Sequence, residues 1–173
     1  DATGHVFVTG AETSWPPDSM IFYGNPDIQI ATGPFVAKYS VDGDLLWAKS
    51  LGKKLAPRSI STGARSIVYG AAQGPGAEIL GLSIPIGSAF AKGFIAIIDT
   101  VFEQVEQLHL FNAPELSVLT DYVCAADNGH IFSGVFMDTL FLSMDTLHAP
   151  PGEYRTFLLR LDSTGITEQW VMD

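Results

Sequence analysis

Short runs of alternating apolar and polar residues, rather than long helical stripes, recur along this chain. Residues 6–9, 35–39 and 45–50 are rich in β-branched and aromatic side chains and are typical of strands. Between the last two runs lies Val41-Asp42-Gly43-Asp44, where Asp-Gly favours the positive φ values of a tight hairpin. No segment has a sustained 3.6-residue apolar period with caps, and the nearest, 101–108, also fits a pair of strands. The pattern predicts an all-β protein.

The runs themselves recur at a fixed period. One series consists of GHVFVTG at residues 4–10, RSIVYG at 65–70 as a looser middle copy, and GHIFSG at 129–134. Its closing glycines are Gly10, Gly70 and Gly134. A second series, FVAKYS, FIAIID and FLLRLD, begins at Phe35, Phe94 and Phe157. Because two independent series share one period, we interpret the chain as about three copies of a unit of roughly 60 residues.

Each unit is interpreted as four strands, and the units fall at approximately 1–60, 61–124 and 125–173. Four-stranded units that repeat at a fixed period, separated by Gly/Pro loops, indicate the blades of a β-propeller. A stacked β-solenoid is the alternative, although its rungs are usually shorter than this unit. We therefore expect a single β-propeller segment over 1–173, incomplete at its ends and part of a larger propeller.

Two details within the units carry further expectations. Residues 21–23 and 28–30 flank Gly24-Asn25-Pro26-Asp27 and predict a short hairpin in the first unit. Trp47 and Trp170 each follow a turn glycine, in the first and third units. We expect these two tryptophans to occupy equivalent positions and to pack between neighbouring blades.

The quoted strings resemble a known repeat family. Residues 1–10 (DATGHVFVTG) and 35–47 (FVAKYSVDGDLLW) are similar to the D-x-x-G-N-V-Y-V-T-G and F-V-A-K-Y-D-x-x-G-x-L-x-W strands of the bacterial SBBP β-propeller repeat. The first copy matches closely, the third moderately and the second poorly. The resemblance implies an extracellular or cell-surface protein of the Bacteroidota type, associated with the outer membrane and often exported by type IX secretion. It also implies further blades, because such propellers close with more than three.

Composition and charge limit the classes of partner that we expect. Of 173 residues, 47% are hydrophobic, 11% aromatic and 16% charged, which is typical of a globular chain rather than a disordered one. A formal net charge of −10 opposes contact with phosphate backbones, so no nucleic-acid partner is expected. The apolar runs are all shorter than a membrane-spanning helix requires, so no transmembrane segment is expected. The single cysteine, Cys124, cannot form an intrachain disulfide, and we interpret it as a buried small hydrophobe.

No pattern predicts a catalytic, cofactor-binding or metal-binding residue. The histidines His5, His109, His130 and His148 show neither H-x-H nor H-E-x-x-H spacing. We expect structural or exposed positions for His5 and His130, and a solvent-facing side chain for His109. Turn chemistry accounts for the aspartates Asp42, Asp44 and Asp162 without calcium, because the further ligands of an EF-hand loop are missing.

Two loops are candidate recognition elements. Trp15 and Asp18 lie in the proline-containing string ETSWPPD, and the comparable loop of the third unit offers Tyr154 and Arg155. Exposed aromatic side chains on loops are typical of contact surfaces, although loop aromatics often just cover a blade edge. These four residues are the predicted loop contacts.

Three functions remain open from the sequence. The leading hypothesis is a non-catalytic extracellular scaffold or interaction module that binds a protein or a glycan at the cell surface. The second is a glycan-active hydrolase or lyase with its site at the propeller mouth. The third is cargo or an accessory subunit of an outer-membrane export or uptake complex, such as secretion machinery. Carboxylates or a metal converging on the propeller axis would favour the enzyme, and co-purification with a membrane complex would favour the third.

Overall fold

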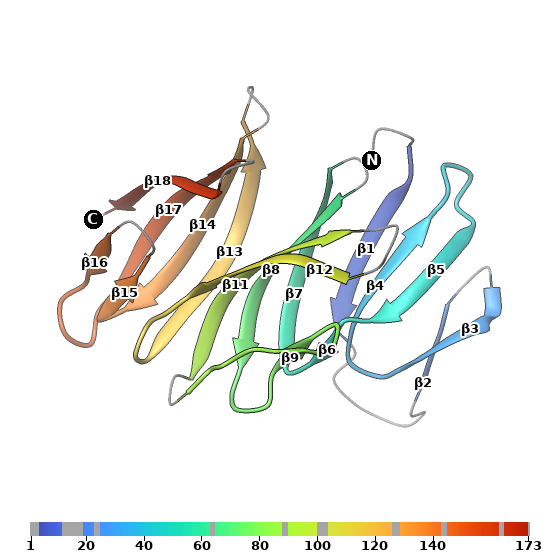
Figure 1. Cartoon of the computed structure of the whole chain (residues 1–173), viewed down its shortest axis with the longest axis horizontal. Coiled ribbons are helices and arrows are strands. Elements are labelled where there is room, and N and C mark those ends of the chain that lie inside the picture. The colour runs from blue at the N-terminus through green and yellow to red at the C-terminus, as the bar shows by residue number, and fades with distance from the viewer. Residues whose placement is uncertain are drawn as a thin grey trace.

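The chain is built from β-strands. A computed structural model describes residues 4–11, 19–22, 25–62, 65–87, 90–99, 104–125, 129–142, 145–162 and 165–172. Every regular element in these ranges is a strand, which confirms the predicted all-β class. The same ranges contain no helix able to span a membrane. Figure 1 shows the strands grouped along the long axis of the molecule.

Three antiparallel sheets form the body of the molecule. The first sheet has the order β1-β4-β5 (Val6–Ala11, Pro34–Tyr39, Leu45–Ser50). The second has the order β7-β8-β11-β12 (Leu55–Thr62, Arg65–Gln73, Ala91–Asp99, Gln104–Phe111). The third has the order β13-β14-β17-β18 (Leu116–Cys124, His130–Met137, Tyr154–Asp162, Gly165–Met172). One parallel pair, Ala91 with Leu116, makes the second and third sheets continuous at a single point.

In each main sheet, the chain forms a small separate sheet between two neighbouring main strands: between β1 and β4, between β8 and β11, and between β14 and β17. It is β2-β3 (Ser19–Phe22, Asn25–Ala31) in the first and β15-β16 (Thr139–Phe141, Thr146–His148) in the third. In the second it is β9-β10 (Glu78–Ile79, Leu82–Ser83), extended by β6 (Gly52–Lys53). In Figure 1 the small sheets of the first and second main sheets lie towards the lower edge, and β15-β16 lies at the left, at the lower end of the third main sheet.

The two repeated sequence series meet as strand partners. The opposed pairs are Gly10 with Phe35, Gly70 with Phe94 and Gly134 with Phe157. Three residues after each phenylalanine the pairing with the next strand slips, between Lys38 and Tyr39, Ile97 and Ile98, and Arg160 and Leu161. A β-bulge bends a strand and increases its twist. All three sheets therefore carry one glycine–phenylalanine pair and one bulge at matching positions.

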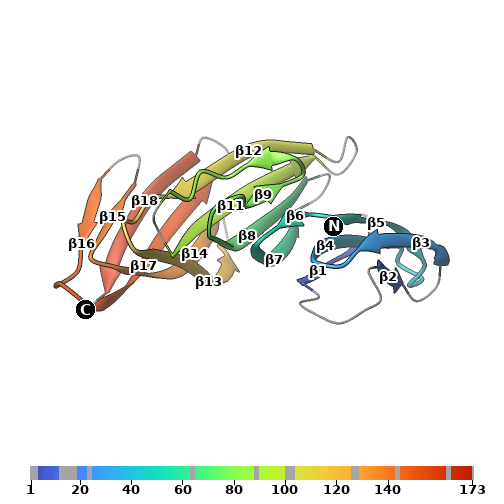
Figure 2. The ribbon, with the colours of Figure 1, turned by 90° about the horizontal axis from the view of Figure 1, so that it is seen from below.

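The sheets pack face to face in chain order. The core between the first and second sheets contains Val36, Val68, Phe94, Ala96 and Ile98. The core between the second and third contains Ile67, Ile95, Phe111, Phe132, Phe157 and Leu159. Phe94 and Phe157 are both 0% exposed, so each recurring phenylalanine of these two sheets faces the preceding sheet. Figure 2 shows the sheets following one another along the long axis.

The two predicted hairpins form. In the Asp-Gly hairpin, Ser40 Oγ accepts the backbone N–H groups of Asp42 and Asp44 at 3.2 and 3.0 Å, and Gly43 has a φ of 88°. The shorter hairpin forms as β2-β3, but it pairs apart from the first sheet and β3 begins at Asn25, inside the predicted turn. Pairing, rather than strand propensity alone, thus sets where these strands begin.

The prediction that Trp47 and Trp170 occupy equivalent packing positions is wrong. Trp47 lies opposite Lys38, whereas Trp170 lies opposite Leu158, two positions nearer the recurring phenylalanine of its sheet. Trp47 is half-buried and packs against the core between the first and second sheets, as predicted, whereas Trp170 is 42% exposed. The difference arises because the turn of the third hairpin is shorter, so that Gly165 already pairs within the strand and is no longer a turn glycine.

Candidate functional site

The predicted loop contacts do not form one patch. Trp15 and Asp18 lie outside the described residues. Tyr154 and Arg155 are the first two residues of β17, and successive strand residues point to opposite faces. Tyr154 is 60% exposed, whereas Arg155 is half-buried opposite Phe136. Of the two, Tyr154 is the side chain available for contact.

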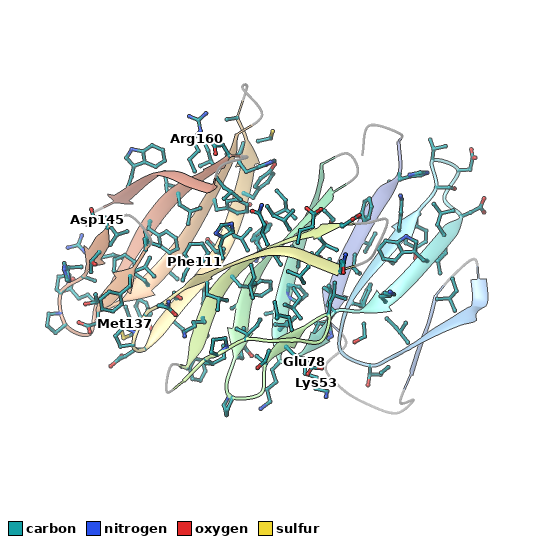
Figure 3. All side chains as sticks on the ribbon, viewed as in Figure 1. Lys53, Glu78, Phe111, Met137, Asp145 and Arg160 are labelled. Carbon is teal, nitrogen blue, oxygen red and sulfur yellow. The ribbon has the colours of Figure 1, made fainter. Side chains whose placement is uncertain are left out.

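Two of the small sheets present further exposed apolar side chains. Leu82 on β10 is 46% exposed and Phe141 on β15 is 50% exposed. We call these two residues together with Tyr154 the hairpin end. Beside it, Lys53 and Glu78 form an ion pair at 3.6 Å, which lies at the lower edge of Figure 3. The hairpin end therefore combines exposed apolar groups with charged neighbours.

A polar contact joins the first strands of the second and third sheets. Arg58 on β7 donates from Nη1 to the carbonyl oxygen of Thr120 on β13. The pairing of β13 slips between Leu119 and Asp121, so Thr120 lies outside the ladder. A bulge of this kind often re-aims groups at the edge of a sheet. Here it places the carbonyl of Thr120 within reach of a guanidinium from the neighbouring sheet.

An aromatic cluster lies beside this contact. Tyr122 stacks on His130 with ring centroids 5.7 Å apart, and its hydroxyl lies 2.9 Å from His130 Nδ1. Phe132 contacts both Tyr122 and Tyr69, at centroid distances of 5.2 and 5.3 Å. Tyr69 is 5% exposed and comes from the second sheet, whereas the other three rings come from the third. The cluster therefore packs the two sheets together.

Burial controls the protonation of the cluster. Burial raises the pKa of Tyr69, an effect that the Arg58 charge opposes and the Asp121 carboxylate reinforces. Burial also raises the pKa of Tyr122 and lowers the pKa of His130. Both tyrosines are therefore protonated near pH 7 and the imidazole is neutral, so the hydrogen bond between the Tyr122 hydroxyl and His130 Nδ1 joins two uncharged groups, and the imidazole tautomer decides which of them donates.

These groups bond mainly to one another. Arg58 binds Thr120, Tyr122 binds His130, and the Thr120 hydroxyl lies 3.2 Å from Ser133 Oγ. Within the described ranges, no three His, Cys, Asp or Glu side chains are placed to hold a metal ion. The arrangement is suited to holding two sheets in register, because each bond crosses between strands or between sheets.

Two predictions about single residues are wrong. Cys124 is exposed, not buried, because the last residues of β13 extend past the packed core, in which Leu119 is the last buried side chain of that strand. His109 does not face solvent: its Nε2 is buried and has no hydrogen-bond partner among the described residues. It lies opposite the fully buried Ile95, and burial lowers its pKa. The predicted structural role of His130 agrees with its contacts to Tyr122.

Described residues line at least two hollows at the surface. A groove of about 340 Å³ between the first and second sheets is lined by Phe7, Val8, Thr9, Pro57 and Arg58. A hollow of about 140 Å³ on the third sheet is lined by Asp121, Tyr122, Val123, Ile131, Ser133 and Leu158. Most of its lining comes from the face of the third sheet that points away from the second.

Sequence reasoning gives no signal for Arg58, Tyr69 or Tyr122. They come from different strands, and the contact between Arg58 and Thr120 joins residues 62 positions apart. No local spacing could reveal such a set before the stacking of the sheets is known. Neither family models nor curated proteins provide a match to this chain.

Proposed function

We propose that this chain is a β-propeller segment that serves as a rigid, non-catalytic interaction module. The observation that carries the proposal is the recurrence of one glycine–phenylalanine pair and one bulge in three sheets that pack face to face. Propeller blades are four-stranded antiparallel sheets repeated around an axis, and the antiparallel pairings of the second and third sheets each join four strands in this way. The antiparallel order favours blades over the rungs of a parallel β-solenoid.

The proposal includes membership of the SBBP-type repeat family and a place outside the cell or on its surface. Both rest on the strings at residues 1–10 and 35–47, and on the shared period of roughly 60 residues. The structure adds a physical reason why the two series recur together, because their glycine and phenylalanine are partners across adjacent strands. A repeat of this kind supplies a stable frame on which variable connections are carried.

We place the contact surface at the hairpin end. The main sheets repeat, whereas the small sheets between them differ in size and pairing. Connections of this kind carry binding residues on a rigid frame. Tyr154, Phe141 and Leu82 are exposed there, and aromatic anchors dominate the energy of many contact surfaces. The ligand is a glycan or a protein at the cell surface.

A binding screen tests this proposal. The purified chain is presented to immobilised polysaccharides and to outer-membrane vesicles from a Bacteroidota species, and binding is followed by biolayer interferometry. We expect saturable binding that weakens about tenfold or more in Tyr154→Ala and Phe141→Ala. The matched control is Val41→Ala, because Val41 is 71% exposed on the turn between β4 and β5 at the opposite end.

The screen also has outcomes that overturn the proposal. Binding to neither class of surface would do so, as would an equal loss in the Val41→Ala control. Release of reducing ends or unsaturated products from a bound polysaccharide would instead establish the hydrolase or lyase alternative.

A further inference from the structure

Phe90 is an exposed aromatic residue whose backbone is held in place. It lies directly before β11, and its ring is 78% exposed, the highest value among the exposed large apolar side chains of the described ranges. The next residue, Ala91, is 1% exposed and pairs with Leu116 where the second and third sheets join. The N–H of Phe90 donates to the carbonyl oxygen of Glu115 at 2.8 Å. Phe90 and Glu115 each precede one member of that pair, so their side chains point to the same side, away from the core.

Phe141 is a second exposed ring with a fixed backbone. Its N–H donates to the carbonyl oxygen of Asn112 at 2.8 Å, and the two residues form an isolated bridge. Leu140, the preceding residue, is 0% exposed in the core between the second and third sheets, whereas Phe141 is 50% exposed. Successive strand residues point to opposite sides, and directly opposed residues point to the same side. Phe141 and Asn112 therefore both point away from this core.

The connection between β12 and β13 joins the two rings. Its ends, Asn112 and Glu115, carry the two carbonyl groups just described, and Pro114 between them is exposed. These ends are three residues apart, so their Cα atoms lie within about 11 Å of each other. A strand spacing of about 5 Å on each side brings the two phenylalanines within about 20 Å of each other. We call Phe90, Pro114, Glu115 and Phe141 the Phe90–Phe141 patch. It lies where the second sheet meets the third, rather than on an outer face of the stack of sheets.

The rim of this patch is acidic. Glu115 is exposed within it, and Asp145 is exposed directly before β16, the strand that pairs with β15. In the part of the chain that the structure describes, neither carboxylate forms an ion pair. On the adjoining strands β11 and β16, Lys92 donates from Nζ to a backbone carbonyl of the connection before β11 at 2.6 Å, and His148 Nδ1 lies 3.4 Å from Thr139 Oγ1. With a net charge of −10 on the whole chain, the patch favours a positively charged partner.

We propose that the Phe90–Phe141 patch binds an extended segment of a partner protein, in which apolar side chains lie between Lys or Arg residues. An apolar centre with a polar, charged rim is the usual arrangement of a protein–protein interface. Six residues of extended chain span about 20 Å, which matches the patch. A neutral polysaccharide would leave both carboxylates without a counter-charge, and an acidic one would be repelled. The inference rests on the interaction module proposed above and names the class of its partner.

Selection from a random dodecapeptide library displayed on phage tests this partner class. We expect peptides selected on the purified chain to combine Lys or Arg with apolar residues, and to bind less tightly as added salt screens the opposite charges. The dissociation constants of these peptides should rise at least about tenfold for Phe90→Ala, which removes an aromatic anchor, and for Glu115→Lys, which reverses a charge. The matched controls are Val41→Ala and Asp42→Lys, which make the same kinds of change at exposed positions of the turn between β4 and β5.

The outcomes separate this inference from the proposed function. A selection without binders, selected peptides without basic residues, or an equal loss in the Asp42→Lys control would overturn the basic partner. Polysaccharide binding that Phe141→Ala weakens but Glu115→Lys leaves unchanged would also overturn it, while supporting the proposed function. Binding to neither polysaccharides nor vesicles would overturn the proposed function, whatever the peptides do. Circular dichroism of each variant verifies that the sheets still form.

Discussion

Phe157 lies across the bare backbone of Gly134. A Cβ atom at Gly134 would stand 2.4 Å from Phe157 Cζ and 2.6 Å from the carbonyl oxygen of Val118. No side chain fits there, because such contacts are far inside van der Waals separation. The ring of Phe157 is in turn 0% exposed and faces the second sheet. The glycine is thus what lets an aromatic ring fill the space between two sheets.

Replacing this glycine should be costly. We expect Gly134→Ala to lower the free energy of unfolding by about 2 to 4 kcal/mol, since both the ring and a backbone oxygen would have to move. Gly10→Ala is the matched comparison, because its Cβ would meet only the ring of the half-buried Phe35, at 2.8 Å. Urea unfolding should rank the Gly134 variant as the more damaging. Equal midpoints for the two variants would contradict this account of the pair.

Ser117 links the third sheet to the second through two buried hydrogen bonds. Its Oγ donates to the carbonyl oxygen of Phe111 at 2.6 Å and accepts the backbone N–H of Gly93 at 2.9 Å. We expect Ser117→Ala to cost about 1 to 3 kcal/mol, because both backbone groups are left unpaired away from water. Ser83→Ala, at an exposed position of β10, should change stability by less than about 0.5 kcal/mol. Thermal unfolding of the two variants measures the difference, and a loss common to both would refute a specific link.

Acid should destabilise the fold through two histidines. Burial lowers the pKa of His109 and of His130 below the value of an unfolded histidine, about 6.5. The unfolded chain therefore binds more protons in this range, so stability is complete above that pH and falls as the pH drops towards the folded pKa values. Unfolding free energies measured between pH 7.5 and about 5.5 should show this slope.

The His109 contribution can be isolated. His109→Leu and His109→Gln both remove the titrating group, so both should flatten the slope, by less than about 1.4 kcal/mol per pH unit. Only His109→Leu should also raise stability at pH 8, because it removes the unpartnered buried nitrogen without introducing another polar group. A slope unchanged in both variants would show that His109 is not buried in solution.

The charges around Tyr69 provide a test of the contact between the sheets. Arg58 lowers the pKa of Tyr69 and Asp121 raises it, on top of the larger effect of burial. We expect Arg58→Met to move the alkaline titration of Tyr69 to higher pH, and Asp121→Asn to move it to lower pH. NMR titration of labelled tyrosine rings measures both. Shifts in the same direction would mean that the two side chains do not flank this hydroxyl.

Local patterns were enough to predict part of this fold. Short stretches of sequence are enough to predict the all-β class, the Asp-Gly hairpin and the shared period, because alternation, turn chemistry and repetition are local patterns. β7 was not predicted, since its sequence LAPRSIST alternates weakly and contains Pro57. It is a strand because it pairs with β8, where Pro57 lies opposite Gly70.

The aromatic cluster and the contact between Arg58 and Thr120 depend on pairings between distant residues, which no short stretch of the sequence reveals. The bulge at Thr120 reverses the alternation of β13, so Tyr122 turns towards the second sheet and meets Tyr69. The same bulge brings Thr120 within reach of Arg58, which belongs to another sheet. A one-residue slip in pairing of this kind has no signature in composition or spacing.

Nuclear Overhauser contacts of labelled phenylalanine rings test the central claim most directly. If equivalent sheets stack in chain order, the Phe157 ring must contact Gly134 Hα within its own sheet and Phe111 on the neighbouring one. The Phe35 ring must contact Gly10 Hα in the same way, but without a ring from a preceding sheet of the same chain. These contacts together would support three matched sheets packed face to face. Contact of Phe157 with Gly134 but not with Phe111, or no contact between either glycine and its phenylalanine, would contradict the account.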